Sequence, residues 1–309
     1  MRLPLMLLAA LTLVAEAPHV AAQTTDDAAL TKKINAYVGC INRLSARAFD
    51  SRQRYFSWAQ KSGPTGKERI IYGLYTIYDT KDCAKSVEAA NALEPRETDI
   101  EAAASTYVAA VTALEPLLKE ADDYYTQQDY KDDKMAKGRA LHPRLVAAWD
   151  AFGAADSALR ARIDQIQEKR AIARIAEIER TEGKNARYHI EELMLRAKQV
   201  MRVQGGAKPD VAAIAGVLGD YEAIVKATEA FVAANPDNKI GSSFLSSAKT
   251  FLTTSKQLMR RIRDKVPYSQ GDKMMLATGS GAWMVEGSPA RQLRDYNSLV
   301  DAYNRGGRF

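Results

Sequence analysis

Apolar side chains recur at spacings of three and four residues along most of the chain. Positions three and four apart share one face of an α-helix, so such a stripe predicts an amphipathic helix. The first stripe predicts one long helix over residues 26–60, ending at Ser62-Gly63-Pro64-Thr65-Gly66, where glycine and proline remove helix propensity. Its apolar positions are Leu30, Ile34, Tyr37, Ile41, Leu44 and Ala48.

The clearest stripe follows Pro95 and has the seven, four and three spacings of a coiled-coil seam. We expect Thr98 or Asp99 to cap this helix and Pro116 to kink it or break it at Glu115. A shorter helix is predicted before it, over residues 80–93, and residues 70–78 fit a short helix or an irregular turn. The seam positions are Ile100, Tyr107, Val111, Leu114, Leu118 and Tyr125.

Residues 144–200 carry two stripes separated by a highly charged stretch. An unbroken helix of that length would measure about 85 Å, too long for one small bundle. Of the two alternatives, we favour a long helix connecting two bundles over a break near Gly183. The stripe positions are Leu145, Trp149, Phe152, Leu159, Ile163 and Ile166, then Ile190, Leu193, Ala197 and Val200.

The remaining pattern predicts helices over residues 210–234, 242–265 and 288–303, with a glycine-containing loop over 277–287. Glycine (18) and proline (10) are scarce among 309 residues, and few segments are rich in β-branched residues. We therefore expect an all-α protein built as a long-helix bundle. Residues 23–166 should form an N-terminal helical bundle stapled by a disulfide, and residues 167–309 a long connecting helix and a C-terminal helical region.

The first 22 residues have the order of a secretory signal. Arg2 precedes an apolar stretch over residues 3–15, and Val20-Ala21-Ala22 offers a cleavage site after Ala22. The competing interpretation, a membrane anchor, needs about 20 apolar residues, and this stretch is shorter. We expect a periplasmic or secreted protein with no transmembrane span after cleavage.

Two cysteines, Cys40 and Cys83, remain in the mature chain. In an oxidising compartment such a pair is expected to form a disulfide, which would constrain the unfolded chain by roughly 4 kcal/mol. Two buried thiols or a metal pair are the alternatives.

The positive charge lies in the second half of the chain. Residues 23–142 hold 17 Lys and Arg against 18 Asp and Glu, whereas residues 143–309 hold 26 against 19. A basic half favours anionic partners, although it also fits simple solubility. Export and the lack of a known module argue against nucleic-acid binding. A possible anionic-surface patch, or alternatively a solvated rim over a buried face, consists of Lys249, Lys256, Arg260 and Arg263.

His189 and Glu192, at positions i and i+3 of a predicted helix, are weak candidates for a metal site. The pair resembles the His-x-x-Glu signature of imelysin-like exported proteins, but Arg187 stands where that signature has glycine. A structural histidine is the commoner case. We expect His142, before Pro143, to help start a helix.

Aromatic residues gather beside the Gly63–Gly66 loop and could form a ligand pocket or a core. The pocket candidates are Tyr55, Trp58, Tyr72 and Tyr75. The densest carboxylate group, around Asp122 and Asp133, has interleaved lysines and fits a solvated helix face better than a cation site. No nucleophile motif is present, so we predict neither catalysis nor a cofactor.

Several stretches, in order, resemble the YiiG-like family of exported bacterial proteins of unknown function. They are the neighbourhood of Tyr37, Cys40 and Asn42; Tyr55-Phe56-Ser57-Trp58; residues 63–68 with Tyr72-Gly73-Leu74-Tyr75 and Cys83; residues 129–143; Met284-Val285-Glu286-Gly287-Ser288-Pro289; and Asp295-Tyr296-Asn297-Ser298-Leu299. The resemblance implies a helical extracytoplasmic protein, often a lipoprotein, although no cysteine follows the cleavage site here to carry a lipid.

These features favour a non-catalytic protein that binds an unidentified cell-envelope component or another protein through a helical surface. The alternatives are a periplasmic metal- or small-ligand-binding protein, centred on His189 and Glu192 or on the aromatic residues, and an envelope hydrolase that uses a carboxylate pair.

Overall fold

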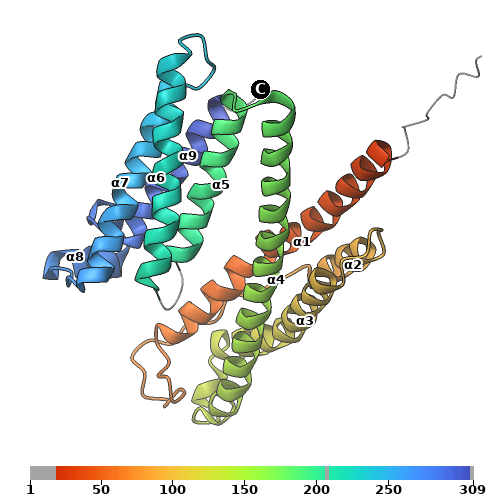
Figure 1. Ribbon diagram of the computed structural model, residues 1–309. Helices are drawn as coiled ribbons and strands as arrows, with labels where there is room; N and C mark the ends of the chain where they lie inside the picture. The colour runs from red at the N-terminus through yellow and green to blue at the C-terminus, as the bar shows by residue number, and fades with distance from the viewer. Residues whose placement is uncertain (1–18, 206–208, 307–309) are drawn as a thin grey trace, which may run out of the picture. The chain divides into compact units, whose positions relative to one another are not determined.

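The computed structural model describes residues 19–205 and 209–306, and between 19 and 26 it describes the backbone alone (Figure 1). Within these ranges the chain is all-α, with no strand, as predicted. The predicted signal peptide and its cleavage site after Ala22 lie outside the residues whose side chains are described and stay predictions. The elements are α1 (His19–Phe56), α2 (Thr80–Asn91), α3 (Thr98–Thr126), η1 (Asp129–Lys131), α4 (Ala136–Glu182), α5 (Ala186–Gln204), α6 (Val211–Ala234), α7 (Ser242–Asp264), α8 (Gln270–Thr278), η2 (Ala282–Met284) and α9 (Pro289–Gly306).

The chain divides into two compact units, an N-terminal unit up to Gln165 and a C-terminal unit from Ile166. Helix α4 crosses that division, but it does not continue to residue 200. It ends at Glu182, because Gly183 takes a left-handed conformation with φ of 73° and the Asn185 side chain then caps α5 by accepting from the Tyr188 N–H at 3.0 Å. The uninterrupted helix that we favoured is therefore wrong, and the break near Gly183 is observed.

The predicted stripes form the core of each unit. In α1, all the predicted positions but Leu30 are buried, and all six positions of the α3 seam are buried. Helix α3 nevertheless runs unbroken through Pro116, and its N-cap is Glu97, not Thr98 or Asp99. Helix α4 likewise begins eight residues before Arg144 and contains Pro143. In both helices, burial of the apolar stripe on either side outweighs the local cost of a proline.

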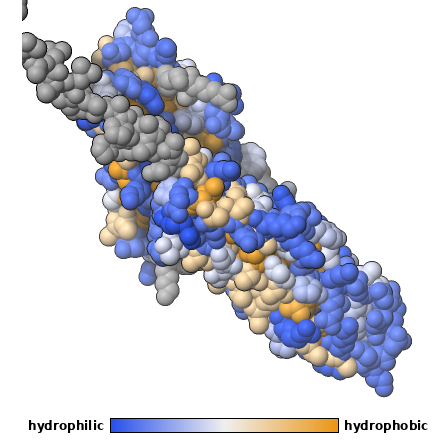
Figure 2. All heavy atoms as spheres, turned by 90° about the vertical axis from the view of Figure 1, so that its right-hand side faces the viewer, coloured by the Kyte–Doolittle hydropathy of each residue, from blue (hydrophilic) through white to orange (hydrophobic). Residues whose placement is uncertain are grey.

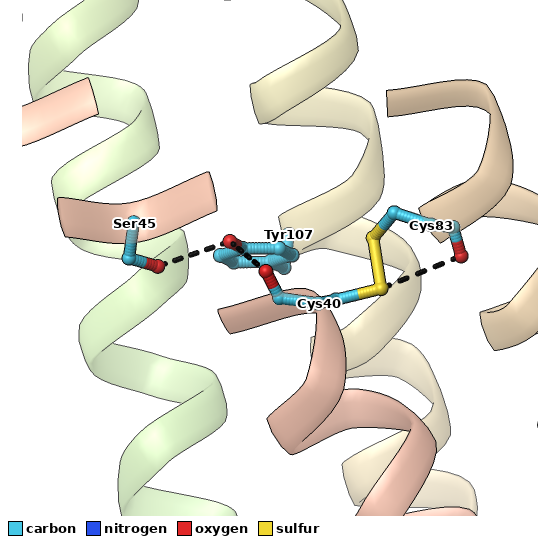
Figure 3. The surroundings of a disulfide bond; sticks show 4 residues. All are labelled: Cys40, Ser45, Cys83 and Tyr107. Atoms are coloured by element: carbon cyan, nitrogen blue, oxygen red, sulfur yellow. Dashed lines mark hydrogen bonds between the residues drawn. A yellow bond between two sulfur atoms is a disulfide. The ribbon is translucent and has the colours of Figure 1, made fainter. Parts of the chain in front are cut away.

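The disulfide between Cys40 and Cys83 joins α1 to α2, and both cysteines are buried. Figure 3 shows the polar contacts beside it. The Tyr107 hydroxyl lies 3.4 Å from the carbonyl oxygen of Cys40 and 3.0 Å from the Ser45 hydroxyl, which donates to the buried Asp156 carboxylate at 2.6 Å. These bonds connect α1, α3 and α4, so the disulfide and a polar network fix the same region of the unit.

A buried ionic cluster joins the first half of α1 to the start of α3. Glu101 is 4% exposed and accepts hydrogen bonds from Lys33, from the Arg96 guanidinium at 2.6 Å and from the backbone N–H of Glu97 at 2.8 Å. The ammonium of Lys33, which is fully buried, also donates to the Pro95 carbonyl at 2.8 Å. Every charge of the cluster therefore has a partner, as burial requires.

The C-terminal unit packs α5 against α6, α6 against α7 and α7 against α9. Besides an apolar core, it contains a buried chain of amides. The Gln204 amide donates to the Ser255 carbonyl at 2.9 Å, and the Gln292 amide donates to Gln204 and, at 3.0 Å, to the Ser255 hydroxyl. Thr254 donates to Asp295 at 2.5 Å. These bonds hold α5, α7 and α9 in one register.

Replacing both cysteines, as Cys40→Ala with Cys83→Ala, should lower the free energy of unfolding by about 4 kcal/mol, because the unfolded chain loses a 43-residue loop constraint. Urea denaturation followed by circular dichroism measures this. An unchanged midpoint would contradict it. Wild-type protein in reductant should approach the variant's midpoint only after prior unfolding, since both sulfurs are buried.

The ionic cluster predicts a loss of stability in acid. The Arg96 hydrogen bond, with further bonds from Glu97 and Lys33, lowers the pKa of Glu101 from its ordinary 4.5 to about 2. A carboxyl with a lowered folded-state pKa stabilises the fold above its ordinary pKa, and this contribution disappears as the pH falls from about 4.5 to about 2.

Glu101→Gln should remove that pH dependence and cost about 3 kcal/mol at pH 7, because the Lys33 charge stays buried without a carboxylate. Thermal unfolding at pH 7 and pH 3 measures both effects. The exposed Glu88→Gln is the matched control and should change neither. Equal pH profiles for wild type and Glu101→Gln would count against this role.

Candidate interaction surface

The aromatic residues of the N-terminal unit occupy two different surroundings. Tyr55 is fully buried, and the Trp58, Tyr125, His142 and Trp149 rings lie with their centroids 5.2 to 6.3 Å from its own. Its hydroxyl lies 2.8 Å from His142 Nδ1. The Nε2 atom of His142 lies 3.2 Å from the Lys61 carbonyl oxygen in the loop after α1. His142 stands six residues after the start of α4, so our expectation that it helps to start a helix is wrong.

Tyr72 and Tyr75, the other two pocket candidates, lie on the extended connection between α1 and α2. The Arg54 guanidinium lies 4.9 Å from the Tyr72 ring and 4.7 Å from the Tyr75 ring, and it donates to the Gly73 carbonyl at 2.6 Å. Arg47 covers Tyr75 at 4.5 Å. The structure thus places Tyr55 and Trp58 in a packed aromatic cluster. Tyr72 and Tyr75 instead lie against arginines of α1, which hold the connection between α1 and α2 in place.

His189 and Glu192 have separate partners within the C-terminal unit. His189 is 5% exposed, stacks on Phe231 with centroids 4.6 Å apart and lies 3.4 Å from the Thr228 hydroxyl through Nδ1. Glu192 pairs with Arg196 at 2.8 Å. Across the described ranges, no three His, Cys, Asp or Glu side chains gather as metal ligands would.

Carboxylates of the acidic group also have local partners. Asp122 accepts from the Leu74 backbone N–H at 2.9 Å, and Asp133 accepts from the Tyr124 hydroxyl and from the Lys137 N–H, each at 2.8 Å. The first bond holds the connection between α1 and α2 to α3, and the others fasten the start of α4.

The candidate basic patch of α7 is largely neutralised. Lys249 pairs with Glu229 at 2.7 Å, Lys256 with Glu222 at 2.6 Å and Arg263 with Asp264 at 2.7 Å. Of the four predicted residues, only Arg260 has no ion pair among the described residues. Lys249 also lines a surface hollow of about 550 Å³ along α7. Besides Arg260, two exposed lysines without an ion pair among the described residues, Lys265 and Lys273, follow the end of α7.

The segment after α7 displays apolar side chains to solvent. We define the C-terminal surface as the exposed apolar and basic side chains of residues 260–294. Its helix α8 has no buried residue. The exposed large apolar residues are Val266 (50%), Met274 (67%), Trp283 (47%), Met284 (51%) and Leu293 (50%). In Figure 1, α8 lies beside the C-terminal end of α7.

Arg261 holds the backbone of this surface in place. Its guanidinium donates to the carbonyls of Pro267 at 3.1 Å and Glu286 at 3.0 Å, and it lies 4.4 Å from the Tyr268 ring. Gly287, with φ of 63°, passes so close that an added Cβ would lie 3.0 Å from Arg261 Nε. A single arginine on α7 therefore links the turn after α7 to the segment that precedes α9.

Two further contacts order the exposed apolar residues. Ser269 and Asp272 form a capping box at the start of α8, with the Asp272 N–H donating to Ser269 Oγ at 3.1 Å. Trp283 lies under the Arg294 guanidinium, 4.5 Å from ring to charge, and lines a shallow hollow of about 550 Å³ together with Leu293. The apolar residues are thus presented by a folded segment.

The C-terminal surface is also basic. Residues 260–294 contain seven Lys and Arg against three Asp and Glu, and the buried Val285 anchors their backbone to the unit. Lys265 and Lys273 are exposed and make no ion pair with any described residue. The sequence pattern predicted a loop over part of this segment and missed α8. The signal that could have located it is a tryptophan and several methionines among lysines and arginines.

Hydrophilic residues surround smaller apolar areas on the face seen in Figure 2, which is the usual appearance of a protein surface in water. Among the described residues, no helix combines the length and the apolar character that crossing a bilayer requires.

Comparison with known proteins identifies relatives without a known function. A family model described as "Protein of unknown function (DUF3829)" matches residues 28–305. The chain is 38% identical over 294 residues to the "Uncharacterized protein YiiG" of Escherichia coli (strain K12), which covers 93% of this chain and 82% of that protein. No solved structure matches.

Burial lowers the pKa of His189 below its ordinary 6.5. Its ring should therefore be neutral at pH 7, and its contribution to stability should decline as the pH falls below 6.5, because the unfolded chain then binds a proton that the folded chain excludes. NMR titration of the histidine rings, with His189→Gln to assign the signal, measures the pKa. A value at or above 6.5 would refute a buried, packing role.

Proposed function

Since this chain belongs to the DUF3829 family of proteins of unknown function, which matches nearly its whole length, we propose that it is an exported, non-catalytic protein of the cell envelope. It binds an envelope component or another protein through the C-terminal surface. The observation that carries this proposal is the exposure of five large apolar side chains on a folded segment, beside Arg260, Lys265 and Lys273, which are exposed and have no ion pair among the described residues.

A partner that covered these exposed apolar side chains would be stabilised by their burial. Burying apolar surface contributes about 25 cal/mol per Å², so a partner that covers Met274, Trp283 and Met284 would gain several kcal/mol. The capping box and the Arg261 contacts hold the segment before binding, which reduces the ordering cost that a flexible loop would have.

Export is supported by the signal-like residues 1–22 and agrees with the buried disulfide, since stable disulfides are typical of oxidising compartments. The absence of catalysis is supported by the local partners of the candidate groups. Asp122 and Asp133 accept hydrogen bonds from backbone N–H groups, and Glu192 pairs with an arginine. His189 is buried in the core.

The proposal predicts the location and the contacts of the protein in cells. In a Gram-negative host, the mature protein should begin at Gln23, carry an oxidised Cys40–Cys83 pair and leave the cell on osmotic shock or with the envelope fraction. Mass spectrometry of each fraction measures this. Uncleaved protein confined to the cytoplasm would overturn export.

Binding is tested in the same cells with a photo-crosslinking amino acid placed at Leu293. We expect adducts with an envelope component. The matched control position is Ile172, which is 51% exposed on α4 in the same unit and outside the surface. Equal adducts from both positions, or none from Leu293, would overturn the assignment of the surface.

A further inference from the structure

We infer that the C-terminal surface docks on the anionic face of a phospholipid bilayer, lying in the headgroup region without crossing it. This inference rests on the proposed function only for the compartment in which the lipid is met. The inference identifies the partner of the surface, and its support comes only from contacts within the C-terminal unit.

The apolar part of the surface has the composition of an interfacial segment. A tryptophan, two methionines and a leucine are about half exposed or more, on and around a short helix that buries no residue of its own. Tryptophan prefers the boundary between headgroups and acyl chains, and an amphipathic helix on that boundary buries its apolar side chains by a few ångströms. Helix α8, with nine residues, is too short to cross a bilayer.

The charges of the surface are complementary to such a bilayer. Residues 260–294 contain seven cations and three carboxylates. Arg263 pairs with Asp264 and Arg294 with Asp295, whereas Asp272 accepts from the backbone at the start of α8. Lys265 at the end of α7 and Lys273 on α8 are exposed without an ion pair among the described residues. Each cation near an anionic membrane surface favours binding, and the attraction weakens with salt.

The arrangement favours a bilayer over a folded protein partner. The exposed apolar residues are dispersed over α8, η2 and the start of α9 with cations between them, and the hollow beside Trp283 is shallow and open. A protein interface concentrates its apolar residues in a core from which charges are depleted. A headgroup layer instead accepts cations and apolar side chains interspersed at one depth.

The test uses purified full-length mature protein and large unilamellar vesicles, either of zwitterionic phosphatidylcholine alone or with phosphatidylglycerol added. Co-sedimentation should show at least about tenfold tighter binding to the anionic vesicles, and binding should fall steeply between about 0.05 and 0.5 M salt. Equal binding to both vesicles, or binding to neither, would overturn the inference.

Two pairs of variants locate the contact. Lys265→Glu with Lys273→Glu should weaken binding to anionic vesicles about tenfold or more, whereas the charge-matched control, Lys169→Glu with Lys239→Glu, should bind within about twofold of wild type. Met274→Ser with Trp283→Ser should also weaken binding, whereas Ile172→Ser should not. Thermal unfolding verifies that each variant is folded. Equal loss in test and control variants would overturn the location.

The outcomes separate this inference from the proposed function. Adducts from Leu293 to a protein, together with no vesicle binding, would overturn the lipid partner and leave the proposed function standing. Vesicle binding by a protein that stays uncleaved in the cytoplasm would overturn the proposed function and leave the lipid partner standing.

Discussion

Polar groups buried between helices must find partners inside the protein, and this constraint fixes how the helices of each unit align. Apolar stripes alone allow neighbouring helices to slide by one turn with little loss of contact. The Glu101 carboxylate allows no such slide, because its donors come from Lys33 on α1 and from Arg96 and Glu97 just before α3. In the C-terminal unit, the amides of Gln204 and Gln292 impose the same restriction on α5, α7 and α9.

The fold class and most helices were predictable because burial follows the three-and-four spacing directly. The predictions failed where two signals competed. Pro116 and Pro143 lie within continuous helices, since the buried stripes on both sides outweigh one lost hydrogen bond. Gly183 does end a helix, because no buried stripe crosses it: after Ile178, residues 179–184 are all exposed. A proline or glycine therefore breaks a helix here only where burial is marginal.

The candidate site was less predictable for a different reason. A sequence shows which residues carry charge, but not which charges are paired across helices. Lys249 and Lys256 look equivalent to Lys273 in the sequence, yet Glu229 and Glu222 neutralise the first two from α6. Exposure of Met274 and Trp283 is likewise decided by the turn that Arg261 holds, which no periodicity reports.

Burial of the bond between Cys40 and Cys83 also governs how the protein exchanges thiols. A reductant or an exchange enzyme must place its sulfur in line with the bond, and the burial of both cysteines prevents that approach. Exchange must therefore wait for α1 and α2 to separate locally, at a rate governed by that opening equilibrium. Once formed, the disulfide is reduced only slowly, and its lifetime in reductant reports how stably α1 and α2 pack against each other.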